Sequence, residues 1–309
     1  MSRRKVYTGE VHHICQMTVG KVVIFYTVAD YLVFFTIYCT FAEKYDVEVL
    51  AVCPMPDHLH NSVIVRSAKQ LSTFVRDYGN TYARLWNKSR SRRGQLFYHS
   101  YQCSAKLGNK QVRSTLAYNY NNPVERKLVE RAEEYRWNFL PYATSANPYS
   151  QPVEKKNTSQ AYKRAANEVK YLRNTGQFLN YALIERLFEK LTTQEKQQLI
   201  DYIIGLWNII DFQKAISYYG SIETMIRAFH DNTGADYDIK EDRDPYSDTV
   251  YSDCIRILTK EQLVSSLYDI PMLPMERKLE LYQVLRQRTS ARPKQLRKFL
   301  HIPKNEVTD

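Results

Sequence analysis

The sequence predicts an α+β fold, with an antiparallel sheet and flanking helices in its first 145 residues and a mostly helical region after them. Two observations carry this prediction. Before residue 145, short apolar runs of strand length alternate with longer segments in which apolar residues recur at helical spacing. At 146 the sequence turns polar and proline-containing, NPYSQPVEKKNTSQ, and beyond it helical spacing dominates.

The elements of the first region follow in order. Strands are predicted at 10–19, 22–25, 47–55, 58–65 and 96–105, and helices at 28–44, 68–89 and 109–122. Ser67 is the expected N-cap of the second helix, and Pro123 is expected to stop the third. The short link at 56–57 favours an antiparallel hairpin. The helix at 28–44 is apolar nearly all round, so its second face needs a partner element.

The second region divides into a linker, 146–160, and a helical domain, 161–309. Helices are predicted at 160–174, 178–191, 193–208, 210–217, 221–230, 259–268, 275–288 and 292–301. Between 286 and 304 there are seven Lys and Arg residues and no acidic residue. A trihelical DNA-binding end at 259–302 is therefore one hypothesis, and a solvated terminal helix is the alternative.

Charge favours a polyanionic partner. The net charge is +11, and residues 1–150 hold 20 Lys and Arg against 11 Asp and Glu. Five cysteines without paired spacing indicate a reducing compartment, and we expect a cytoplasmic protein. The apolar stretch 22–42 is long enough to span a membrane, but Asp30 near its middle costs about 2.5–3.5 kcal/mol on insertion. No membrane association is expected.

The segment MPDHLH, 55–60, places two histidines one residue apart on a predicted strand. His58 and His60 therefore point to the same face. Two imidazoles can fill two positions on a divalent ion, and a third protein ligand is normally needed. His12 and His13, on the first strand, are expected to be ordinary strand residues, one facing in and one facing out.

The segment YNYNNP, 118–123, can supply a nucleophile and the third ligand. On a helix, Tyr118 shares a face with Asn122, four residues on, whereas Tyr120 is turned roughly 200° away. A phenol of pKa about 10 is a weak nucleophile at neutral pH, so attack on a phosphodiester needs a metal ion to offset the phosphate charge. Tyr118 would then be joined covalently to DNA.

With the segments MPDHLH, YNYNNPV and EYRWNF in this order, residues 8–145 resemble the single-tyrosine HUH transposases, and among them the REP-associated tyrosine transposases. The resemblance implies a ferredoxin-like (RRM-like) nuclease domain that cleaves single-stranded or hairpin DNA. It implies His58 and His60 as ligands of Mg²⁺ or Mn²⁺ and Tyr118 as the nucleophile that forms a 5′-phosphotyrosine. Asn122 stands where related transposases place a glutamine. A homodimer is left open, because relatives include swapped dimers and monomers.

Two rival functions stay open. A DNA-binding regulator could keep the fold without cleavage, or Tyr118 and Tyr120 could imitate the two tyrosines of a replication initiator or relaxase. Tyr98 and Tyr101 could stack on bases, although core packing is the simpler role. Nine basic residues are predicted to contact DNA phosphates: Arg66, Lys69, Arg76, Arg84, Arg90, Arg92, Arg93, Lys106 and Arg113.

Overall fold

The computed structural model describes residues 5–154, 158–232 and 246–307. Across these ranges, four strands form one antiparallel sheet in the order β2-β3-β1-β4. The strands and the helices between them are β1 Val11–Met17, α1 Val28–Lys44, β2 Glu48–Met55, β3 His58–Ile64, α2 Ala68–Ser89, β4 Gln102–Lys106 and α3 Gly108–Glu125. The predicted α+β class is confirmed, as is the hairpin, in which Met55 pairs with His58.

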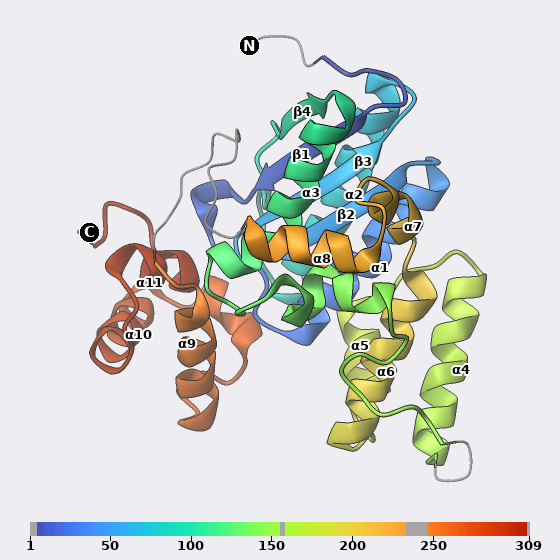
Figure 1. Cartoon of the computed structure of the whole chain (residues 1–309). Helices are drawn as coiled ribbons and strands as arrows, with labels where there is room; N and C mark the ends of the chain where they lie inside the picture. Colours follow the sequence, from blue (N-terminus) through green and yellow to red (C-terminus); the bar gives the residue numbers. More distant parts are fainter. Residues whose placement is uncertain (1–4, 155–157, 233–245, 308–309) are drawn as a thin grey trace.

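Helices cover both faces of the sheet. On one face, Leu59 and Val63 of β3 join a core with α1 and α2. On the other face, Ile64 of β3 packs with Val112 and Leu116 of α3. Figure 1 shows α3 lying across the front of the sheet. A fully buried large apolar side chain contributes roughly 1.5–3 kcal/mol, so both layers hold the sheet strongly.

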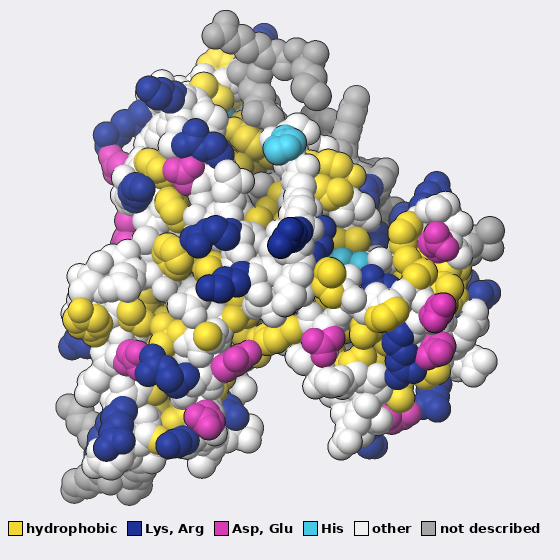
Figure 2. Space-filling model, turned by 180° about the vertical axis from the view of Figure 1, so that it is seen from behind, with side chains coloured by type: hydrophobic (Ala, Val, Ile, Leu, Met, Phe, Trp, Pro, Cys, Tyr) yellow, Lys and Arg dark blue, Asp and Glu magenta, His cyan; other side chains and the backbone are white. Residues whose placement is uncertain are grey.

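The second region is helical, as predicted, and packs directly on the first. Its helices are α4 Gln160–Asn174, α5 Tyr181–Phe188, α6 Thr193–Trp207, α7 Phe212–Ser217, α8 Ile222–Asp231, α9 Thr249–Lys260, α10 Met275–Arg288 and α11 Pro293–Leu300. Helices α5 and α6 contact the outer side of α1, which gives that apolar helix its second partner. The α4–α6 group and the α9–α11 group project as two lobes with an open notch between them (Figures 1 and 2). None of the described helices is both long enough and apolar enough to cross a bilayer.

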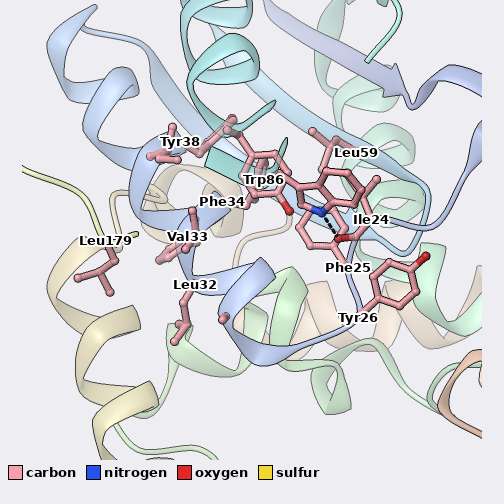
Figure 3. Close-up of a cluster of buried hydrophobic side chains, with 14 of the residues drawn as sticks. Ile24, Phe25, Tyr26, Leu32, Val33, Phe34, Tyr38, Leu59, Trp86 and Leu179 are labelled. Carbon is pink, nitrogen blue, oxygen red and sulfur yellow. Dashed lines mark hydrogen bonds between the residues drawn. The ribbon is translucent and has the colours of Figure 1, made fainter. Parts of the chain in front are cut away.

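Residues 22–25 were predicted as a strand, and that prediction is wrong. The segment is extended but lies outside the sheet. Its backbone bonds to other partners: Ile24 N–H donates to the carbonyl of Pro56 (2.8 Å), and Val23 N–H donates to that of Lys298 (3.1 Å). Figure 3 shows Ile24, Phe25 and Tyr26 beside Trp86, whose indole donates to the Ile24 carbonyl at 2.8 Å.

Three other boundaries differ from the predictions. Helix α3 continues past Pro123 to Glu125, because a proline in the last turn removes little of the helical hydrogen bonding. In place of the predicted strand 96–105, the strand runs over Gln102–Lys106, and Phe97 makes a single bridge to Thr18. The helix predicted at 259–268 is replaced by α9 and a 3-10 turn at Leu267–Met272, because the apolar spacing that α9 buries begins earlier.

Candidate nuclease site

The α3 face of the sheet positions the two predicted metal ligands. His58 and His60 lie on β3, opposite Met17 and Cys15 of β1. Because side chains alternate along a strand, both imidazoles point toward α3, with ring centroids 4.7 Å apart and planes nearly perpendicular. Both side chains are buried, and His60 is 0% exposed.

A third histidine, His13 of β1, joins them. Its Nε2 lies 3.2 Å from His60 Nδ1, and the two rings stack with centroids 5.4 Å apart. His12 points to the opposite face, where its Nε2 accepts a hydrogen bond from the Tyr7 N–H and burial lowers the pKa of its imidazole. The expectation that one of this pair faces outward is wrong: both are buried, because helices cover both faces.

Asp57, in the β2–β3 turn, holds the other predicted ligand. Its Oδ1 lies 2.6 Å from His58 Nδ1, and its Oδ2 lies 2.8 Å from the Nζ of Lys298 in α11. Burial raises the pKa of the Asp57 carboxyl, but its interactions with His58 and Lys298 more than offset this effect, so the pKa lies well below its usual range. At 2.6 Å a carboxylate oxygen accepts a hydrogen bond, so Nδ1 of His58 carries the proton.

Tyr118 packs against the histidines. Its ring stands edge-on to His60 (centroids 5.3 Å apart) and to His13 (5.7 Å), and the residue is 7% exposed. Tyr120 is directed elsewhere: its hydroxyl donates to the Leu50 carbonyl at 2.9 Å and its ring stacks on Phe229. Burial raises the pKa of Tyr120. Helix geometry therefore separates the two tyrosines, and only Tyr118 meets the histidines.

Asn122, the predicted third ligand, is buried one turn beyond Tyr118, and its backbone carbonyl accepts from the Arg126 N–H. Nearby, Asn119 donates to the Ser62 hydroxyl at 2.6 Å and ties α3 to β3 two residues after His60. Among the described residues, no three His, Cys, Asp or Glu side chains are grouped as metal ligands. Asn122 carries an amide and falls outside that set.

The donor chemistry fits a divalent ion. In metal sites the second nitrogen of a ligating histidine usually bonds to a carboxylate or another acceptor, which fixes its tautomer. His58 has such a partner in Asp57, and His13 engages Nδ1 of His60. Both rings would therefore ligate through Nε2.

The sequence missed two contributors beside these histidines, His13 and Asp57, and a more distant one, Lys298. For His13 a signal was present, since the antiparallel pairing of the strands at 10–19 and 58–65 puts alternate residues of both on one face. Asp57 stands inside the MPDHLH motif. Nothing local marks Lys298, which is 241 residues from its partner.

The structure separates the predicted DNA contacts. Lys106 of β4 shares the face of His13, and Arg113 is exposed on α3. Arg76 and Arg84 are exposed on α2, the helix on the opposite face. Of the remainder, Arg66, Lys69 and Arg93 are exposed and Arg92 is half-buried.

Arg90 is excluded from this set. Its side chain is 0% exposed and pairs with the equally buried Asp30 at 2.5 Å. The guanidinium also lies over the ring of Trp86, 4.2 Å from its centroid. The helical region supplies another partner, Tyr181, whose hydroxyl donates to Asp30 at 2.8 Å. Arg90 therefore cannot contact a phosphate while this network is intact.

Comparisons with known proteins gave one family match and one structural match. The family described as "Transposase IS200 like" matches residues 5–122, which include His13, His58, His60, Tyr118 and Asn122. A solved structure described as a REP-associated tyrosine transposase bound to a REP hairpin covers 52% of this chain and 94% of its own, with 14% identity and a TM-score of 0.41. No curated protein matches the sequence. Residues 5–122 of this chain are thus similar in sequence to the IS200-like transposases.

Proposed function

We propose that this chain is a transposase that cleaves and rejoins single-stranded DNA through Tyr118. The observation that carries the proposal is the edge-on packing of Tyr118 against His60 and His13 inside an IS200-like domain. The DNA partner is supported by the net charge of +11 and by exposed basic residues around the sheet.

In the proposed step, the Tyr118 hydroxyl oxygen forms a bond to phosphorus while the bond from phosphorus to the 3′ oxygen breaks. The phenol loses its proton, and the leaving 3′ oxygen gains one, which gives a 5′-phosphotyrosine and a free 3′-OH. His58, His60 and Asn122 would hold Mg²⁺ or Mn²⁺. That ion would supply the positive charge that polarises the scissile phosphate. His13 holds His60 in place, and α3 carries Tyr118 to both.

Tyr118 packs against His60 and His13 of its own chain. The proposal therefore does not require a second copy, and a homodimer remains a separate expectation.

The test is covalent adduct formation with a single-stranded hairpin oligonucleotide, measured on a denaturing gel with Mg²⁺ or Mn²⁺ present. Tyr118→Phe should give no adduct. Tyr120→Phe is the matched control and should keep it, since that hydroxyl is bonded to Leu50. An adduct that survives Tyr118→Phe would show that the nucleophile is wrongly assigned.

The main alternative is a DNA-binding regulator without cleavage. The near-complete burial of Tyr118 and His60 favours it, because a phosphate must displace neighbouring atoms to reach them. It predicts hairpin binding with no adduct under any divalent ion. The initiator or relaxase alternative needs a second tyrosine at the site, and the position of Tyr120 speaks against it.

The basic loop after α2 gives a second test of DNA contact. Joint charge reversal of Arg92 and Arg93 should weaken binding about equally for all sequences and reduce the salt slope of the binding constant. Equal slopes for variant and wild type would exclude the loop from the interface.

A further inference from the structure

The last helix of the chain reaches the candidate site. Lys298 of α11 extends its Nζ to 2.8 Å from Asp57 Oδ2, and its side chain is 9% exposed. The other oxygen of that carboxylate bonds to His58. Lys298, Asp57 and His58 thus form one buried chain of contacts that runs from the helical region to a predicted metal ligand.

Segment 22–26 fixes the position of α11 against the β2–β3 turn. Toward α11, Val23 N–H donates to the Lys298 carbonyl, and the Tyr26 hydroxyl donates to that of Phe299 at 2.6 Å. Toward the turn, Ile24 N–H donates to Pro56, the residue before Asp57. The anchoring of α11 therefore does not depend on the lysine.

A charged lysine at this position needs its own explanation. Removing an ammonium group from water costs several kcal/mol, and a well-packed apolar side chain of similar size often serves stability as well or better. With α11 already anchored by its backbone, packing alone gives no reason for this cation. Its contact with Asp57 supplies the reason, since that carboxylate has one oxygen for each partner.

We propose that Lys298 is a positioning residue, which orients the Asp57 carboxylate and through it holds His58 in the Nδ1–H tautomer with Nε2 directed away from Asp57. The helical region then completes the site of the sheet domain. The consequence for metal binding rests on the proposed function, whereas the effect on His58 does not.

The experiment uses the full-length protein labelled with ¹⁵N-histidine, without metal, at one pH above neutrality. The ¹⁵N NMR chemical shifts of the His58 ring report its tautomer. They are assigned as the signals that disappear in the His58→Gln variant. Wild type should show the Nδ1–H form alone, and Lys298→Met should show a mixture of tautomers. Lys298→Arg, which keeps the charge, should restore the wild-type signal.

Lys278→Met is the matched control. Lys278 is also a buried lysine of the helical region, but its Nζ donates to the carbonyls of Pro271 and His301. This variant should lose stability and leave the His58 signal unchanged. If Lys298→Met does not fold, Lys298→Gln, which lacks the charge, is scored in the same way.

Mn²⁺ titration of the same variants separates the two proposals. Loss of Lys298, which acts on His58 through Asp57, should weaken Mn²⁺ binding by about 10-fold, the low end of the effect of groups that bond directly to a ligand. An unchanged His58 signal in Lys298→Met overturns the role of Lys298, even if wild type binds Mn²⁺ and forms the adduct. A changed signal in a protein that does not bind Mn²⁺ supports Lys298 and overturns the proposed metal site.

Discussion

The α1–α2 side of the sheet and its α3 side each contain a buried carboxylate paired with a cation, and each takes one histidine from β1. On the first side, Asp30 pairs with Arg90, and its oxygens also accept from the Tyr26 and Thr27 backbone and from Tyr181. On the second side, Asp57 pairs with Lys298 and His58.

The difference lies in the remaining partners. Those of Asp30 cap a helix start and join two regions of the chain, so the pair acts as a structural clamp. Asp57 instead bonds to Nδ1 of His58, whose Nε2 is the nitrogen proposed to bind the metal ion. Burial of a charge therefore does not by itself identify a functional group. The two carboxylates differ in their partners: Asp57 contacts His58, a predicted metal ligand, whereas Asp30 contacts Arg90 and Tyr181, which are not predicted ligands.

The largest expected effect comes from Asp30→Asn. It leaves the Arg90 charge buried without its counter-ion, and the free energy of unfolding should fall by about 3–5 kcal/mol in urea titrations. Adduct formation per folded molecule should not change. The double variant Asp30→Asn with Arg90→Met should recover part of the loss. A decrease below about 1 kcal/mol would contradict the clamp.

Asp57→Asn should act mainly on chemistry. We expect the rate of adduct formation per folded molecule to fall by about 10- to 100-fold, because His58 loses its charged acceptor. Asp57→Asn should also lower stability, because it leaves the buried Lys298 cation without its counter-ion. Adding Lys298→Met should restore the stability but not the rate. Recovery of both the stability and the rate would show that the Asp57–Lys298 pair is structural, like the Asp30–Arg90 pair.

The third prediction compares His13 and His12, which are adjacent on β1 but face opposite sides of the sheet, and the expected change in adduct rate is smaller. His13→Gln should lower the adduct rate by about 10-fold, the low end for a residue that holds a ligand, because His60 loses its Nδ1 partner. His12→Gln lies on the opposite face and should leave the rate per folded molecule unchanged. Equal effects on the rate would indicate that His13 acts through general stability.

The smallest effect concerns DNA affinity on the two sides of the sheet. Lys106→Glu and Arg113→Glu, on the α3 side, should weaken binding and reduce the salt slope by about 0.7–0.9 per lost phosphate contact. Arg76→Glu and Arg84→Glu, on α2, should change neither. Binding constants at several salt concentrations decide this, and the reverse pattern would place the DNA along α2.

Apart from the strand wrongly predicted at 22–25, the sequence alone determined the strand and helix order of the sheet region, because apolar periodicity reports directly which residues face a core. Helix α1 and the Ser67 cap of α2 lie where they were predicted. Helical spacing also separated Tyr118 from Tyr120, and strand alternation put His58 and His60 on one face. These are local regularities that hold whatever the rest of the chain does.

Only the tertiary structure decided what lies around those residues. In the sequence Arg90 belongs to a basic loop, but in the structure it is buried and bonds to Asp30, sixty residues earlier. Segment 22–25 has strand composition, yet its backbone partners are a turn and a distant helix. Lys298 belongs to a basic run typical of a solvated helix and instead reaches Asp57. Such pairings depend on long-range chain packing, which leaves no periodic signal in the sequence.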